Sequence, residues 1–308
     1  MAARLSPLPF DAAGLRGLSE KLLVSHHNNN YGGAVKRLNT LRAQLATTAF
    51  ASTPGFQLNG LKREELIATN SMLLHELYFS SLGGDGQTME PAMKLALDAN
   101  FGSAERWREE FVALGQALGG GSGWVLLTFQ PREGTLVNQW AADHTHAVAG
   151  GVPILALDMY EHAYHIDYGA AAAAYVDAFM NNIRWAGVYS RYQAAVDAAS
   201  QPHAAVADDL AAGAVVIDVR RAGVYQQASA MLPGAVWRDP AAVAVWAAEL
   251  PADREVIVYC VYGHEVGRCT ALRLRAAGVN ARYLSGGIDG WQAAGRMVGP
   301  KPTPGEQP

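Results

Sequence analysis

The chain of 308 residues is poor in cysteine, in charge and in long apolar stretches. Its two cysteines, Cys260 and Cys269, are too few for a disulfide framework and suit a reducing compartment. It has no run of about eighteen apolar residues, so we expect no transmembrane segment. A net charge of -4 gives no reason to expect nucleic acid or an anionic membrane surface as partner. The first ten residues lack the apolar core of a signal peptide, so we expect a cytoplasmic protein.

The chain is long and apolar enough for two hydrophobic cores, with 50% hydrophobic residues against 17% charged ones. Apolar residues recur at helical spacing in the first 85 residues, with a break predicted at residues 53–60. From about residue 90 the pattern becomes mixed α/β, and a glycine cluster leads into two short β-rich runs that predict a hairpin. We therefore predict a helical domain over residues 1–85 and an α/β domain over residues 86–198.

The last third of the chain has a different pattern, in which buried strands alternate with helices. Apolar runs of the parallel-strand type occupy residues 214–219 and 255–259, and a shorter strand is predicted at residues 281–284. Helices are predicted between and after them, at residues 240–250 and 266–277. This alternation predicts a small doubly wound parallel sheet, and we assign it to a third domain, residues 199–308.

The stretch from Val152 to Tyr164 holds the strongest chemical signal. A short apolar strand runs directly into Asp158, and His162 follows four residues later. A carboxylate and an imidazole at the end of a buried strand can share one metal ion, which offsets the cost of burying both. The alternative is a strand followed by a helix, with Asp158 as its N-cap and His162 as an interior histidine.

The segment D-M-Y-E-H-A-Y resembles the D-x-W-E-H-A-Y signature of the iron/manganese superoxide dismutase family, with Tyr160 at the tryptophan position. The segments S-P-L-P-F, V-S-H-H-N-N-N-Y-G-G-A-V-K-R-L-N and L-L-H-E-L-Y-F-S-S-L are similar to the family's opening and to its first two ligand helices. The resemblance implies one iron or manganese ion per chain and the disproportionation of superoxide. The metal ligands that it implies are His26, His75, Asp158 and His162.

The resemblance also implies a set of residues around the ligands. Gln139 is similar to the family residue that hydrogen-bonds the solvent at the metal, and His144 and His146 are alternatives to it. Glu161 implies a homo-oligomer, a dimer or tetramer, because in the family it reaches the partner's ligand histidine. The remaining implied neighbours are Trp124, Tyr160 and Tyr164.

Two positions depart from the family pattern on the first ligand helix. The histidine and tyrosine that gate the substrate funnel and relay protons are replaced by Asn30 and Ala34, although Tyr31 is nearby. Ser71 stands where iron-type members carry a glutamine. The departures predict slow or rerouted proton delivery even where the metal binds.

Cys260 directly follows a predicted parallel strand and precedes a helix, where backbone amides and the helix N-terminus favour a thiolate. The alternative is a buried structural cysteine. The segments I-D-V-R, M-L-P-G-A-V, Y-C-V-Y-G-H-E-V-G and L-S-G-G-I-D-G-W make residues 205–297 resemble a rhodanese (sulfurtransferase). The resemblance implies that Cys260 carries sulfur between a small donor and an acceptor and that Cys269 has a packing role. Glu265 replaces the loop arginine and Met231 the usual histidine. The carboxylate disfavours ordinary thiosulfate chemistry and leaves persulfide handling, thiol redox sensing or simple binding as the alternatives.

Two functional hypotheses follow. The first is an iron- or manganese-dependent superoxide dismutase with a rhodanese-like domain of persulfide or sulfur-transfer function. The second is a metal-binding oxidative-stress sensor or scaffold with little dismutase activity. Metal content together with superoxide turnover distinguishes them.

Overall fold

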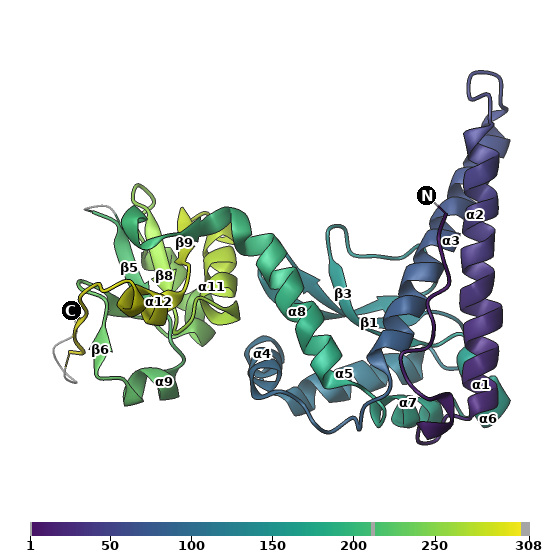
Figure 1. The fold of residues 1–308 in the computed structure, drawn as a ribbon, viewed down its shortest axis with the longest axis horizontal. Helices are drawn as coiled ribbons and strands as arrows, with labels where there is room; N and C mark the ends of the chain where they lie inside the picture. Colours follow the sequence, from purple (N-terminus) through teal and green to yellow (C-terminus); the bar gives the residue numbers. More distant parts are fainter. Residues whose placement is uncertain (1, 211–212, 303–308) are drawn as a thin grey trace. The chain divides into compact units, whose positions relative to one another are not determined.

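A computed structural model describes residues 2–210 and 213–302 of the chain. They form two compact units (Figure 1). Unit 1 comprises residues 1–128 and 136–191, and unit 2 comprises residues 129–135 and 192–308. The predicted multidomain fold class, a helical hairpin with an α/β part followed by a parallel rhodanese-like sheet, is confirmed. The predicted boundaries at residues 86 and 199 stay predictions.

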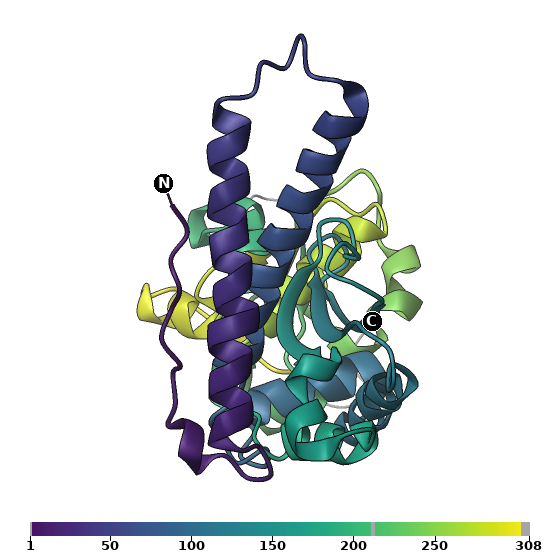
Figure 2. The ribbon, with the colours of Figure 1, turned by 90° about the vertical axis from the view of Figure 1, so that its right-hand side faces the viewer.

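Unit 1 begins with a long helical hairpin. After a short turn η1 (Ala12–Gly14), α1 (Glu20–Ser25) starts where the Ser19 side chain accepts a hydrogen bond from the Leu22 amide. It continues through a π-helical turn η2 (His26–Tyr31) into α2 (Gly32–Ala46). Figures 1 and 2 both show α2 and the long helix α3 (Gly55–Ser81) side by side.

The break between these two helices lies earlier than the sequence predicted. It covers residues 47–54, whereas the prediction was 53–60, and α3 already begins at Gly55 directly after Pro54. A proline is tolerated at a helix start because its missing amide has no partner there. Gly60 lies inside the helix, where its conformational cost is small against the packing of a helix of 27 residues.

The rest of unit 1 is α/β. Pro91 opens one helix, and Ser103 caps the next by accepting a hydrogen bond from the Arg106 amide. A three-stranded sheet of order β2-β1-β3 follows, in which β1 is almost wholly buried. The elements are α4 (Pro91–Phe101), α5 (Ala104–Ala117), β1 (Trp124–Gln130), β2 (Thr135–Ala141), β3 (Val152–Asp158), η3 (Glu161–Ala163), α6 (His165–Tyr168), α7 (Ala172–Met180) and α8 (Trp185–Ser200). The last residues of β1, the first of β2 and the second half of α8 are counted with unit 2.

Unit 2 is built on a five-stranded parallel sheet of order β4-β9-β8-β5-β7. Its strands are β4 (Ala204–Ala205), β5 (Val215–Asp218), β7 (Val236–Trp237), β8 (Val256–Tyr259) and β9 (Ala281–Leu284). Side chains of β8 alternate between two cores: Val256 and Val258 pack in one, and Ile257 and Tyr259 in the other. Burial on both faces explains why the strands are continuous apolar runs in the sequence.

Helices flank this sheet and short elements connect it. The region 240–250, predicted as one helix, is instead three short turns, η6 (Pro240–Ala242), α10 (Val243–Trp246) and η7 (Ala247–Glu249). The Trp246 side chain donates to the Asp239 carbonyl, which holds the broken segment in place. The other elements are η4 (Gln201–His203), η5 (Ala207–Asp209), α9 (Ala222–Gln227), β6 (Ala230–Met231), α11 (Glu265–Ala276), α12 (Gly287–Ala293) and β10 (Gly299–Pro300). Within the described ranges, every helix is too short or too polar to cross a bilayer.

Candidate metal centre

The four predicted ligands come together in unit 1. They come from four separate elements: His26 opens η2, His75 lies in α3, Asp158 ends β3 and His162 lies in η3. One ligand atom from each lies within 4.8 Å of every other. His26, His75 and Asp158 are buried, with at most 1% of each exposed, and His162 is half-buried. The alternative reading of Asp158 as a simple helix cap and His162 as an ordinary interior histidine is therefore excluded.

The carboxylate is the common partner of the three imidazoles. Asp158 Oδ2 lies 3.1 Å from His26 Nε2, 3.4 Å from His75 Nε2 and 3.2 Å from His162 Nε2. The Nε2 atoms of His75 and His162 are 3.4 Å apart. Atoms bound about 2.1 Å from one ion lie about 3.0–3.6 Å apart when their bonds meet at roughly 90–120°. The ligand atoms therefore already have the spacing that a single metal ion requires.

The protonation states of the ligands also suit a metal ion. Burial lowers the pKa of His75 to about 3 and lowers the pKa of His26, so both imidazoles are neutral at physiological pH. Burial opposes ionisation of Asp158, but the imidazoles of His162 and His26 outweigh it and hold the pKa of the carboxyl below its ordinary value. Neutral imidazoles and an ionised carboxylate are the forms that bind metals.

Hydrogen bonds outside the cluster fix how the ligands point. His75 Nδ1 donates to the Ser71 carbonyl one turn earlier at 2.6 Å, which leaves Nε2 unprotonated toward the cluster. Asp158 Oδ1 accepts from the Tyr160 amide at 2.9 Å, so Oδ2 faces the histidines. The hydroxyl of Tyr175 donates to the Asp158 carbonyl at 2.8 Å. Tyr175, in an alanine-rich helix with no distinguishing pattern, was missed by sequence reasoning.

Aromatic rings enclose the cluster. Trp124 is fully buried, and its ring meets the His75 ring edge to face at 5.3 Å. Tyr160 stacks on His162 at 5.3 Å and on His144 at 4.7 Å. The Trp124 indole donates to His144 Nδ1 at 3.0 Å. These apolar surfaces limit the access of water to the ligands.

Gln139, His144 and His146 were the three residues considered as hydrogen-bond partners of the solvent at the metal, and their side chains have different surroundings. Gln139 is buried on β2, where its side-chain oxygen accepts from the Thr128 hydroxyl, and no contact joins it to the ligands within the described residues. The His144 ring lies 6.1 Å from the His75 ring, and its carbonyl accepts from Asn70. His146 accepts from the Ala142 amide and packs on Trp140 instead. Of the two histidines, His144 is the one whose ring lies beside a ligand ring. The assignment of Gln139 stays a prediction. Motif spacing favoured Gln139 but does not show which way each side chain points.

The remaining predicted neighbours have simpler settings. Tyr164 is buried against Tyr175, and the centroids of the two rings are 5.2 Å apart. The Tyr164 hydroxyl accepts a hydrogen bond from the Gly120 amide. Glu161 is exposed beside His162. An exposed carboxylate next to a ligand is available to a partner chain.

The first ligand helix has a geometry that the sequence did not predict. From His26 to Tyr31 the chain forms a π-helical turn, a rare form often found at functional sites. Tyr31 is buried, its hydroxyl donates to Glu76 at 2.9 Å, and that hydroxyl accepts from the Ser6 amide. Asn30 and Ala34 supply no group of the kind that the resemblance places there.

The predicted rhodanese-like site lies in unit 2. Cys260 follows β8 directly and is 6% exposed, and its carbonyl accepts from the Ile288 amide at 3.0 Å. A Cβ built on Gly267 of α11 would lie 3.4 Å from the Cys260 sulfur, so the thiol meets the start of that helix. Cys269 is buried beside the Tyr192 hydroxyl, and burial raises its pKa to about 11. The raised pKa keeps the Cys269 thiol protonated at neutral pH.

Glu265, at the start of α11, is 9% exposed. It lines a cavity of about 210 Å³ together with Asp197 and Arg268, and Cys260 is not among the residues lining it. Arg268 pairs with Asp197 at 3.2 Å. A carboxylate at a helix N-terminus is favoured by the helix dipole.

Comparison with known proteins finds a matching family model in each of the two units. Residues 89–191 match the family model described as "Iron/manganese superoxide dismutases, C-terminal domain", and residues 203–294 match that of the rhodanese-like domain. A "Superoxide dismutase [Fe]" of Cupriavidus metallidurans is 64% identical over 196 residues, covering 64% of this chain and 99% of the relative. The chain belongs to the iron/manganese superoxide dismutase family.

More distant relatives of the family carry either metal in their names. A "Superoxide dismutase [Mn] 1" of Halobacterium salinarum is 36% identical over 204 residues, covering 63% of this chain and 96% of the relative. A "Superoxide dismutase [Fe]" of Aquifex pyrophilus is 33% identical over 192 residues, covering 60% of this chain and 88% of the relative. Both the dismutase and the rhodanese-like resemblances inferred from sequence motifs are thus confirmed.

Proposed function

We propose that the protein is an iron-dependent superoxide dismutase carrying a rhodanese-like domain. The observation that carries this proposal is the convergence of three imidazoles and one carboxylate at ligand spacing. The relative that is 64% identical and covered almost completely is named for iron, which favours iron over manganese. The substrate is superoxide, and the products are dioxygen and hydrogen peroxide.

The reaction balances as two superoxide ions plus two protons giving one dioxygen and one hydrogen peroxide. The ion, when bound, supplies one-electron redox chemistry by alternating between two oxidation states. His26, His75, Asp158 and His162 would hold the ion. Trp124 and Tyr160 restrict water around the cluster, and the uncompensated positive charge of the loaded site favours a small anion.

His144 has a specific role in this proposal, which is to hold solvent at the open side of the site by hydrogen bonding. Its Nδ1 accepts from Trp124, so in the neutral ring Nε2 carries the proton and is the donor. Burial lowers the pKa of His144, which keeps the ring neutral.

Replacing His144 with leucine is therefore expected to lower superoxide turnover by about tenfold to a hundredfold while iron stays bound, because leucine cannot hydrogen-bond the solvent and partners outside the ligands typically have effects of this size. The matched control is His146→Leu, which changes a neighbouring histidine that packs on Trp140. Stopped-flow turnover and iron content of both variants provide the measurement. Equal activities of the two variants would remove His144 from the role.

The same proposal covers the assembly and location of the protein. Glu161, exposed beside His162, is placed to contact a second copy, and we propose a homodimer or tetramer through the dismutase part. The two free cysteines suit the reducing cytoplasm. Proton delivery is proposed to bypass Asn30 and Ala34.

For the rhodanese-like domain we propose sulfur transfer through a persulfide on Cys260. The supporting observations are the match to the domain model over residues 203–294 and the position of the thiol between β8 and α11. The Cys260 thiolate would attack the outer sulfur of a small persulfide donor, so that the Cys260 S–S bond forms as the donor's S–S bond breaks and the donor leaves as a thiolate. A small acceptor thiolate would then attack the outer sulfur on Cys260, which forms the acceptor's persulfide and releases the Cys260 thiolate.

The deciding experiment is elemental analysis and superoxide turnover of protein produced with both iron and manganese available. We expect close to one iron per chain and rapid turnover that is lost on chelation. Stoichiometric metal without turnover would instead identify the chain as a metal-binding sensor or scaffold. Protein that folds but binds neither metal would refute the proposed site.

A further inference from the structure

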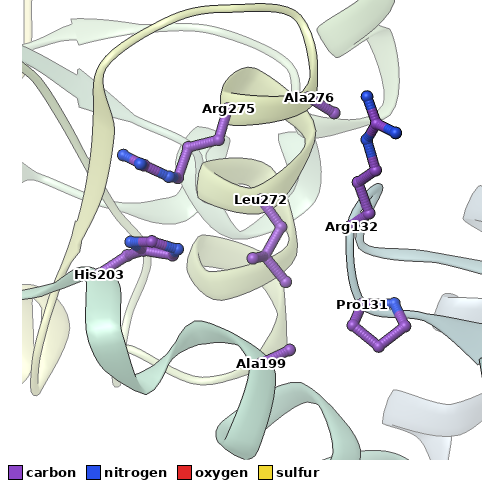
Figure 3. A pocket seen from close by; sticks show the side chains of 7 residues that line it. All are labelled: Pro131, Arg132, Ala199, His203, Leu272, Arg275 and Ala276. Atoms are coloured by element: carbon purple, nitrogen blue, oxygen red, sulfur yellow. The ribbon is translucent and has the colours of Figure 1, made fainter. Parts of the chain in front are cut away.

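Unit 2 contains a cavity of about 400 Å³ that is lined by basic and apolar side chains (Figure 3). Its charged or ionisable lining residues are all basic: Arg132 from the turn after β1, His203 from η4 and Arg275 from α11. The remaining lining is apolar and includes Leu272 and Pro131. Cavities of this size hold small organic molecules.

The positive charges around this cavity are not neutralised by the protein. The guanidinium of Arg275 donates to the Ala281 carbonyl at 3.1 Å, a contact that adds no negative charge. Within the described part of the chain, no carboxylate forms an ion pair with Arg132 or Arg275. Burial and the neighbouring charge of Arg275 both lower the pKa of His203. A protein with a net charge of -4 thus keeps an electropositive cavity.

The basic groups are arranged around an apolar centre. Figure 3 shows Arg275 and His203 on one side of Leu272 and Arg132 on the other. An acidic group placed beside Arg275 would meet a guanidinium, whose fork of donors matches carboxylate and phosphate oxygens. Leu272 itself is only 4% exposed, and the half-buried lining residues Pro131 and Ala199 offer the contact to an apolar body.

We propose that this cavity binds a small organic anion, with its acidic head between Arg275 and His203 and its apolar body toward Ala199 and Pro131. The shared chemistry is a carboxylate or phosphate joined to an apolar group. Arg132 lies at the far end and adds attraction at longer range. The site is separate from the four metal ligands and from Cys260, and it does not depend on either proposed activity.

The test is calorimetric titration of the full-length, metal-loaded protein with four probes: phenyl phosphate, benzoate, inorganic phosphate and phenol. Phenyl phosphate or benzoate, whichever head the cavity prefers, is expected to bind saturably and at least about threefold more tightly than inorganic phosphate, because only the organic anions carry an apolar body that reaches Ala199 and Pro131. Phenol lacks the charge and is expected not to bind. Inorganic phosphate binding as tightly as both organic anions, or phenol binding equally well, would overturn the proposal.

Variants locate the binding. Arg275→Gln is expected to weaken the preferred anion by about tenfold or more, and Arg275→Lys by less, because lysine keeps the charge but loses the fork. Arg132→Gln is expected to have a smaller effect than Arg275→Gln. The matched control is Arg254→Gln, which removes an exposed arginine elsewhere in unit 2. Circular dichroism and superoxide turnover verify that each variant folds. If the Arg275→Gln and Arg254→Gln proteins bound the anion with equal affinity, the proposed site would be refuted.

Discussion

Replacing His26 with glutamine is expected to weaken iron binding by more than about a hundredfold and to remove superoxide turnover. Loss of residues that merely orient ligands weakens metal sites by about tenfold to a hundredfold, so loss of a ligand exceeds that range. His26 Nε2 lies 3.1 Å from the shared carboxylate oxygen, and a glutamine amide in its place is a poor ligand for the ion. The buried carboxylate also loses one of its partners.

The adjacent histidine provides the control. His27 is buried like His26, but its ring hydrogen-bonds to the Ser6 carbonyl and the Asn28 side chain and takes no part in the cluster. His27→Gln should cost about 1 kcal/mol of unfolding free energy through the altered hydrogen bond and leave iron content unchanged. Iron is measured by elemental analysis after dialysis. If both variants lost iron alike, the cluster would not be the metal site.

Replacing Cys260 with serine is expected to abolish persulfide formation and sulfur transfer completely. The sulfur atom is itself the group that receives the transferred sulfur, so a serine hydroxyl cannot substitute for it. Superoxide turnover should be unaffected, because Cys260 is not a metal ligand. Mass spectrometry of the protein after incubation with a persulfide donor detects the added sulfur atom.

The second cysteine makes this test specific. Cys269→Ser changes a thiol that is buried beside Tyr192 and whose pKa is raised to about 11, so it is protonated at neutral pH. This variant should keep persulfide formation. If Cys260→Ser protein still gained a sulfur atom, Cys260 would not be the acceptor. If wild-type protein gained no sulfur atom from any of several classes of donor, sulfur transfer by this domain would be refuted.

The sequence predicted the metal centre well because each ligand lies within a short motif. Asp158 and His162 share one motif at the end of a strand, and His26 and His75 each lie in a helix with a family-like pattern. The parallel strands of unit 2 were also predictable, since burial on both faces demands continuous apolar runs. The strand at residues 281–284 agrees with β9.

Features that depend on packing between distant segments were not predictable. The hydrogen bond of Gln139 to Thr128 was not predicted, because the direction of a side chain on β2 depends on its neighbours across the sheet. The π-helical turn at His26 has no local sequence signal, since the residues that follow it, including Tyr31, are held by contacts to Ser6 and Glu76. Tyr175 was missed for the same reason, because its partner is the carbonyl of Asp158.

The ligand set combines residues that are far apart along the chain, with His26 near its start and His162 beyond the sheet of unit 1. A loaded ion therefore acts as a cross-link between the first helix and the segment after β3. Disulfides perform this task in many secreted proteins, whereas both cysteines of this chain are free and lie in unit 2. A cross-link through a bound ion is reversible. The packing of the N-terminal helix on the segment after β3 is therefore expected to be more stable in iron-loaded protein than in iron-free protein.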